Sequence, residues 1–465
     1  MEVSSLQSAA NKPRANCHIP VKKAAVASAH APNIAIPLRF IVTALLAIAV
    51  GFLILTLNPH LLSTYHYGPQ IIAVTHLFVL GWLCSLIMGA MYQLVPVALE
   101  TKLYSERFAR WHYLLHVIGF IGMVWQFWDW NLKQVGHYGS ALAIGAFIFI
   151  YNLARTIARV PKWNVVAFGI ASALFWLFMV MIAGLFVVSA KCWPQISPFV
   201  PLAQMHAHGH LGVLGFFLMM LVAVSYKLLP MFGLSEIQNQ RRAWASIILL
   251  NVALAGLFPA ILLGSRWKFE FGHLVAVALV LYGFEINAIL KARKRRVLDW
   301  GLKTFLAGVW TLIPLTATGL ILTWPGLPFN ERTGQLENVY GELAILGVLT
   351  LAILGMLYKI IPFLVWYAAY SEWVGRCAVP SLSDLYQQRW QIAGFWTFIP
   401  GIFSLCVSTL LGYEKGVFLS WLLLDASLLC FFINAAIMFS HLLWPKIKTE
   451  PAQTVKTGLL FNALR

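Results

Sequence analysis

The chain contains 465 residues, of which 60% are hydrophobic and only 11% are charged, and its mean hydropathy is +0.78. Soluble globular proteins contain about 45–50% apolar residues, so this composition excludes an ordinary soluble domain. The formal net charge is +17. Because the basic residues lie between apolar segments, we interpret this charge as a signal of membrane topology, with additional contacts to anionic lipid. We do not interpret it as a sign of nucleic-acid binding. We therefore predict an all-α membrane protein in contact with the lipid bilayer.

The first 33 residues are polar and contain no apolar core, so they do not resemble a cleavable signal peptide. We predict that residues 1–33 form a basic cytoplasmic tail and that residues 444–465 form a second cytoplasmic tail. Between them, twelve apolar runs are long enough to cross roughly 30 Å of hydrocarbon. These runs cover residues 34–57, 69–99, 109–130, 136–158, 164–189, 201–232, 243–265, 271–292, 301–324, 339–370, 390–412 and 418–443.

The distribution of Lys and Arg predicts the orientation of these helices, because basic residues accumulate in cytoplasmic loops. With the N-terminus inside, 27 of the 33 basic residues lie in cytoplasmic segments and six lie in the opposite loops. Both termini are then cytoplasmic, and we expect an integral protein of a bacterial inner membrane. The six cysteines form no C-x-x-C or C-x-x-C-H motif, which disfavours covalent c-type haem and a disulfide framework.

Three segments share one spacing pattern, in which Leu, Leu-Gly, Tyr and Pro follow a ligand-capable residue at offsets of 1, 4, 5, 16 and 20. The ligand-capable residues are His76, His210 and Glu342. A Gly, a Tyr and a Pro shared three ways at fixed offsets indicate an internal repeat. The repeat predicts twelve transmembrane helices in three pseudo-repeated four-helix arcs, which cover residues 34–158, 164–292 and 301–443.

The repeat also predicts where its residues lie in the bilayer. His76, His210 and Glu342 share one depth, roughly two helical turns below the predicted outer surface. The shared Tyr lies about 24 Å further along the helix axis, at the inner interface, where an amphipathic ring is expected. We interpret the shared Gly as a site of close helix packing and assign no chemistry to the Tyr and Pro.

Three histidines within five residues, His206, His208 and His210, interrupt an otherwise apolar segment. Ionisable residues inside membrane spans are costly and usually functional. On a regular helix His206 and His210 share a face, whereas His208 points about 200° away. The pair could bind one metal and His208 could address a different compartment, since imidazole suits copper, iron and zinc. The alternative is a polar helix entrance that hydrogen bonds to water.

Four further candidates come from their positions. His76 is alone on its helix, but the repeat aligns it with the third histidine of that cluster, which favours ligation over a satisfied core histidine. His273 begins the eighth predicted helix on the outer side and could complete a metal site with the cluster. Glu285 and Glu342 are membrane-embedded carboxylates, which must be protonated or paired. Either could carry protons, and Glu342 could also hydrogen bond to an imidazole.

These features together resemble subunit I of the haem-copper oxidase superfamily, especially the cbb3-type oxidase and nitric oxide reductase branch. The segments with the closest character are H-L-G-V-L-G-F-F (210–217), Y-K-L-L-P (226–230) and Y-Q-L-V-P (92–96). The resemblance covers about residues 34–445, and it implies twelve helices in three arcs with both termini inside.

Carried over by position, the resemblance implies that His76 is an axial ligand of a low-spin haem and that His210 is a copper ligand. The family's helix 10 carries a His-x-His pair, one for each haem, where this chain has Tyr340 and Glu342. The adjacent histidines of the family's helix 7 have no counterpart, because residues 243–265 contain no His. We therefore expect a divergent relative with a reduced ligand set.

This relative is expected to bind haem b or copper on the outer side, for electron transfer, redox sensing or binding of a diatomic gas. The candidate cofactor ligands are His76, His208 and His210; the candidate metal ligands are His206, His210 and His273; and the candidate second-shell or proton-path residues are Glu342, Tyr340 and Glu285. Two alternatives are a complete terminal oxidase or nitric oxide reductase subunit with relocated ligands, and a copper or haem transport or assembly factor. Electrons would come from a partner, such as a cytochrome c, a quinol or a second membrane subunit.

Overall fold

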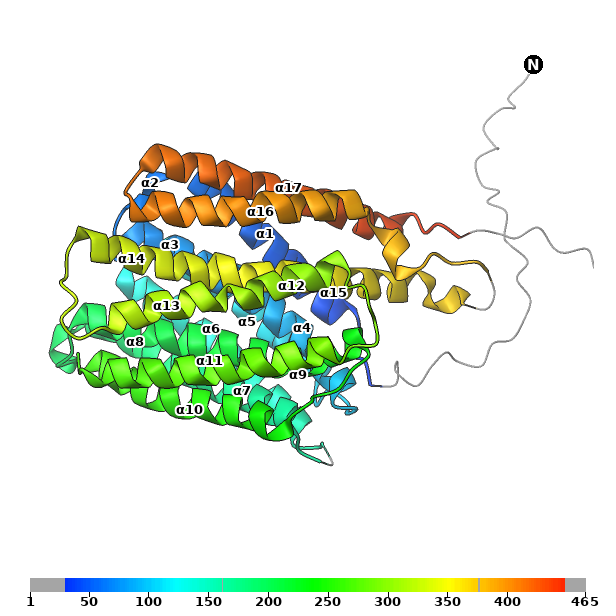
Figure 1. The fold of residues 1–465 in the computed structure, drawn as a ribbon, viewed down its shortest axis with the longest axis horizontal. Coiled ribbons are helices and arrows are strands. Elements are labelled where there is room, and N and C mark those ends of the chain that lie inside the picture. The colour runs from blue at the N-terminus through cyan, green and yellow to red at the C-terminus, as the bar shows by residue number, and fades with distance from the viewer. Residues whose placement is uncertain (1–29, 161, 375–376, 448–465) are drawn as a thin grey trace, which may run out of the picture.

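The computed structural model describes residues 30–160, 162–374 and 377–447, and this part of the chain is built from long, roughly parallel helices (Figure 1). Most of the two predicted tails, 1–33 and 444–465, lies outside the described residues. The long helices that carry no break are α1 (Ala35–Leu57), α5 (Glu106–Trp128), α6 (Leu132–Ile157), α7 (Val165–Cys192), α10 (Gln240–Leu262), α11 (Trp267–Lys291), α16 (Gln388–Leu410) and α17 (Glu414–Leu443). One further pair, α12 (Trp300–Trp310) and α13 (Leu312–Thr323), forms a single crossing with a break between them.

Eleven helices of the described chain are long and apolar enough to cross a membrane. This confirms the prediction of an all-α membrane protein. Helix α5 covers the predicted span 109–130 and is 23 residues long, but it is not among the eleven. The count of twelve helices and their grouping into three arcs therefore stay predictions. The orientation is also a prediction, and we call the end of the bundle at the left of Figure 1, where α2 (His60–Ser63) lies, the predicted outer end.

Three very long helices carry the sequence repeat, and each of them contains a π-helical segment. The first runs through α3 (Pro69–His76), η2 (Leu77–Cys84) and α4 (Ser85–Ala98); the second through α8 (Pro201–His210), η4 (Leu211–Leu218) and α9 (Met219–Gly233); and the third through α14 (Glu331–Glu342), η5 (Leu343–Thr350) and α15 (Leu351–Tyr370). Every π-helix begins directly after the ligand-capable residue of its repeat. Because π-helices are rare, three of them at matching positions show that the repeat is a feature of the backbone as well as of the sequence. π-Helices also occur frequently at functional sites.

The repeated glycines lie where neighbouring helices pack closely. A Cβ atom on Gly81 would lie 2.8 Å from Ala47 Cβ, and one on Gly347 would lie 2.7 Å from Thr311 Cγ2. Gly215 is equally confined, with Trp176 Cβ at 2.7 Å from the same position. These distances are too short for a real side chain, so the structure confirms the predicted role of the glycines in close helix packing.

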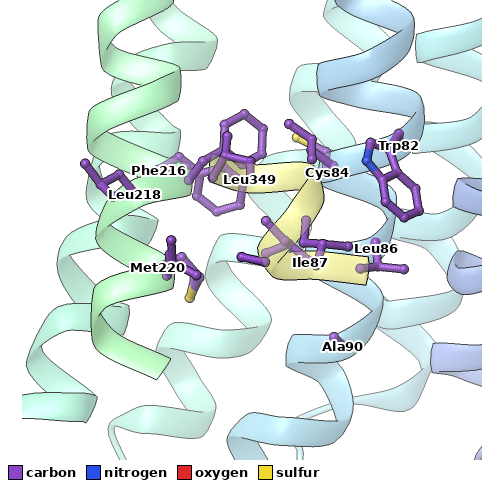
Figure 2. Close-up of a cluster of buried hydrophobic side chains, with 14 of the residues drawn as sticks. Trp82, Cys84, Leu86, Ile87, Ala90, Phe216, Leu218, Met220 and Leu349 are labelled. Carbon is purple, nitrogen blue, oxygen red and sulfur yellow. The ribbon is translucent and has the colours of Figure 1, made fainter. Parts of the chain in front are cut away.

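The middle of the bundle is a solid apolar core where the three long helices meet. Figure 2 shows Trp82 and Cys84 of η2, Phe216 of η4 and Leu349 of η5 gathered in one cluster. The segment η5 contacts both η2 and η4. Trp82 Nε1 donates a hydrogen bond of 3.0 Å to Thr350 Oγ1, which links two of the π-helices through side chains as well as through packing.

Nearer the predicted inner end, the repeated tyrosines are buried and their hydroxyls are paired. Tyr92 Oη lies 3.0 Å from His112 Nδ1, and Tyr226 Oη lies 2.8 Å from Ser246 Oγ. Tyr358 Oη accepts a hydrogen bond of 3.2 Å from the amide of Asn434. Burial with a satisfied hydroxyl is a structural role, which agrees with assigning these tyrosines no chemistry.

Candidate cofactor cavity and metal-ligating cluster

A cavity of about 540 Å³ lies among the long helices towards the predicted outer end. Its walls are mainly apolar and come chiefly from all three repeat helices together with α5, α6, α7, α10, α11 and α13. A concave, mostly apolar space with a few converging polar groups is the usual form of a cofactor site. The histidines and carboxylates in its lining are His66, His76, His206, His208, His210, Glu337 and Glu342.

The two repeat-related histidines are oriented in the same way. His76 Nδ1 lies 2.8 Å from the carbonyl oxygen of Ile72, and His210 Nδ1 lies 2.7 Å from the carbonyl oxygen of His206. A carbonyl can only accept, so each Nδ1 carries a hydrogen and each Nε2 keeps its lone pair free for a metal. A backbone hydrogen bond that fixes the ring in this way is the usual support of a ligating histidine.

His208 shares the cavity with His76, although it belongs to another repeat helix. Its ring lies against α7, where a Cβ atom on Gly184 would be 3.0 Å from His208 Cε1. Within the described chain, His208 Nδ1 is buried and has no hydrogen-bond partner of ordinary geometry. The two rings are also near enough to interact electrostatically. The structure therefore places His76 and His208 on the lining of one cavity and leaves His208 Nδ1 without a hydrogen-bond partner of ordinary geometry.

His206 meets a histidine that the sequence analysis did not select. His206 Nε2 lies 2.9 Å from Nε2 of His66, a residue of the loop before α3. The carboxylate of Glu337, on α14, lies 3.9 Å from the same His66 nitrogen. One ligand atom from each of the three residues lies within 4.8 Å of the others, an arrangement that could hold a metal ion.

The surroundings of His66 keep it in a ligand-ready form. Burial lowers the pKa of His66 below its ordinary value, so the ring is neutral at pH 7. Burial and the neighbouring Glu337 raise the pKa of Tyr65, whose hydroxyl therefore stays protonated and donates a 3.1 Å hydrogen bond to the Glu337 carboxylate. The Tyr65 hydroxyl occupies only one lone pair of the Glu337 carboxylate, so the remaining lone pairs are available to a metal ion.

On the third repeat helix, Tyr340 and Glu342 face different neighbours. The ring of Tyr340 stacks on His210, with centroids 5.7 Å apart and planes inclined by 21°. Glu342 is buried and accepts a 2.7 Å hydrogen bond from Thr409 Oγ1 on α16. Its second oxygen has no partner of ordinary geometry among the described residues. Tyr340 thus supports an imidazole, whereas Glu342 is tied to a helix on the other side.

Two candidate residues from the sequence lie away from the cavity lining. His273 is exposed on α11, where its Nδ1 lies 2.9 Å from the Phe269 carbonyl oxygen and its ring contacts the Phe269 ring. Glu285 is fully buried, but it pairs with Arg242 at 2.7 Å and accepts backbone hydrogen bonds at the start of α10. The structure does not bring His273 to the histidine cluster, and it gives Glu285 a helix-capping role.

Sequence reasoning missed His66 and the π-helices. His66 stands alone in a loop, and its partner His206 is 140 residues away in the chain, so no local spacing could indicate the pair. The π-helices follow the repeated ligand-capable residues, but the apolar letters of these segments are also compatible with an ordinary α-helix.

Comparisons with known proteins support the fold, and the chemistry of the site is inferred from its residues. No protein-family model and no curated protein matches this sequence. Among solved structures, the chain is similar to one described as the cryo-EM structure of a heme-copper terminal oxidase dimer. The TM-score is 0.65 at 12% sequence identity, and the match covers 89% of this chain and 85% of that chain. The chain therefore has a haem-copper oxidase-like fold.

Proposed function

We propose that this protein is a membrane protein that binds haem b and transfers electrons, and that His76 and His208 would hold the haem. The proposal rests on one observation: two imidazoles from different repeat helices line one mainly apolar cavity, and His76 Nε2 and His208 Nδ1 have no hydrogen-bond partner of ordinary geometry in the described structure. Burying two imidazoles in a membrane is costly, and ligation of a haem iron would offset that cost.

The cavity fits such a group in size, polarity and charge. Its volume of about 540 Å³ is in the range of sites that enclose cofactors. Phe127 packs against the His76 ring at 4.5 Å between centroids and, with Leu142 and Val180, presents an apolar wall. Lys191 lines the cavity at its predicted outer end and lies over the Tyr67 and Trp130 rings, where its ammonium group can pair with the carboxylates of haem b.

If His76 and His208 both hold it, haem b would supply one-electron exchange, and two protein ligands favour electron transfer over gas binding. The residues of the cavity would orient the haem ligands and exclude water from the site. The Ile72 carbonyl fixes the His76 ring, and the close contact with Gly184 fixes the edge of His208. The helix that corresponds to the family's helix 7 carries no histidine, so a complete oxidase or nitric oxide reductase is the less supported function.

The test is the optical spectrum of the protein purified from membranes in detergent. We expect a low-spin haem b spectrum with one haem per chain, and its loss in His76→Ala and in His208→Ala. His273→Ala is the matched control, since that histidine is exposed and outside the cavity, and it should leave the spectrum unchanged. Absence of any haem absorption in the wild-type protein would reject the proposal and favour copper or haem handling instead.

His210 supports a second candidate centre, because its Nε2 is presented in the same way as that of His76. We propose it as a ligand of copper or of a further haem, with Tyr340 stacked beside it. Metal analysis of His210→Ala beside the wild type tests this assignment.

Reduction of the bound haem by added quinol or by reduced cytochrome c would identify the class of electron donor.

A further inference from the structure

We propose a divalent transition-metal site at the predicted outer mouth of the cavity, formed by His66, His206 and Glu337. Two imidazole nitrogens and one carboxylate oxygen are the donor set that zinc-type ions prefer. The three residues come from the loop before α3, from α8 and from α14, so a bound ion would join all three repeat helices. The site does not use His76 or His208, so it is independent of the proposed haem.

The hydrogen-bond network presents His66 as a ligand. Both amide hydrogens of Asn338 are donated elsewhere, to the Thr64 carbonyl at 2.8 Å and to Gln335 Oε1 at 3.1 Å. Asn338 Oδ1 therefore accepts, and the 3.1 Å contact with His66 Nδ1 requires that nitrogen to carry the hydrogen. The lone pair of His66 is then on Nε2, the atom that faces His206.

To accept an ion, the three ligand atoms, which lie within 4.8 Å of one another, must move to one common separation, and His206 must carry its ring hydrogen on Nδ1 instead of donating it from Nε2 to His66. In a tetrahedral zinc site with bonds of about 2.0–2.1 Å, ligand atoms lie about 3.3 Å apart. The two imidazole nitrogens are now 2.9 Å apart and the carboxylate oxygen is 3.9 Å from His66 Nε2. The first distance must open and the second must close by a few tenths of an ångström. Three protein ligands leave a fourth position for water or for a group that enters the cavity.

One nearby charge opposes the ion and provides a sharp test. Lys268 lines the same cavity, and its ammonium group acts electrostatically on both His206 and Glu337. A positive charge near the ligands weakens cation binding. Lys268→Gln should therefore raise the zinc affinity, whereas removal of any of the three ligands should lower it.

The experiment titrates Zn²⁺ into the full-length protein, purified without a polyhistidine tag, by calorimetry in competition with a chelator. We expect one Zn²⁺ per chain, and an affinity at least about 100-fold lower in His66→Ala and in Glu337→Gln, because each loses a direct ligand. Asn338→Ala should lose about 10–100-fold, the usual effect of removing a group that orients a ligating histidine. His60→Ala is the matched control, since His60 is an exposed histidine of the same connecting segment, and it should bind as the wild type does.

Two readouts separate this proposal from the proposed function and from misfolding. Co²⁺ in place of Zn²⁺ should give the visible absorption of a tetrahedral site in the wild type and lose it in Glu337→Gln, which preserves the size of the side chain. The haem spectrum should be the same in both proteins. Equal zinc affinities in the wild type, His66→Ala and Glu337→Gln would overturn the metal site, even if the haem is present.

Discussion

The same repeat produces two different regions along the three long helices. Towards the predicted outer end, the histidines line a cavity, and the hydrogen bonds from Nδ1 of His76 and His210 to backbone carbonyls leave the lone pair of each Nε2 free. Towards the predicted inner end, the repeated tyrosines are buried and every one of their hydroxyls is hydrogen bonded. The repeated tyrosines of the inner region serve the fold, whereas the repeated histidines of the outer region keep a ring nitrogen available for a ligand.

The comparison shows how one motif can carry several kinds of site. His76, His210 and Glu342 occupy equivalent positions directly before a π-helix. The two imidazoles bond to the carbonyl one turn earlier, but Glu342 bonds across to Thr409 on another helix. The scaffold sets the depth and the direction of a residue, and the residue type with its neighbours sets the chemistry.

The largest expected effect comes from overfilling the inner region. A Cβ atom on Gly355 would lie 2.5 Å from the backbone oxygen of Gly301 and from the backbone nitrogen of Phe305, so Gly355→Leu should cost about 3 kcal/mol or more and abolish the folded protein. The measurement is the yield of monodisperse protein in detergent. Gly283→Leu is the control, because that position has open space around it. If Gly355→Leu gave the same yield as the wild type, the packing around Gly355 would be looser than these distances indicate.

The outer region should show the opposite response. The double substitution His76→Ala and His208→Ala removes two rings that line a cavity, so we expect complete loss of bound haem with the fold retained. Circular dichroism and size-exclusion chromatography of the variant should match those of wild-type protein that was produced without haem. Aggregation of the variant where haem-free wild type stays folded would mean that these rings are part of the packing.

A smaller effect is expected where an inner hydroxyl is removed. Tyr92→Phe leaves the buried His112 Nδ1 without its partner, which should destabilise the protein by about 1–3 kcal/mol. The haem spectrum should not change. Thermal unfolding beside Tyr413→Phe, a control at an exposed tyrosine, measures the difference. A spectral change in Tyr92→Phe would place this tyrosine in the functional site.

The smallest effect is expected at Glu342. Glu342→Gln keeps an oxygen that can accept from Thr409, so the stability should change by less than about 1 kcal/mol and the haem content should stay the same. Haem quantification and thermal unfolding measure both. Loss of haem in this variant would make the carboxylate a cofactor ligand and would move the proposed site to the third repeat helix.

Much of the architecture was predictable because its signals are local in the chain. Apolar runs predicted the membrane helices, and the repeat predicted the equivalence of His76, His210 and Glu342, which the three π-helices confirm in the backbone. The candidate site was predictable in part, since two of the proposed haem ligands were candidates. His66 was not, because its partners on α8 and α14 are far away in the sequence.

The sequence by itself determined that this chain is a bundle of membrane helices with three equivalent positions, because hydropathy and spacing act within one helix at a time. Only the tertiary structure decided which side chains meet. The position of His76 and His208 on one cavity, and the pairing of His66 with His206 and of Glu285 with Arg242, depend on how helices rotate and pack against one another. Contacts between helices depend on the shapes of both surfaces, and no periodicity within either helix records them.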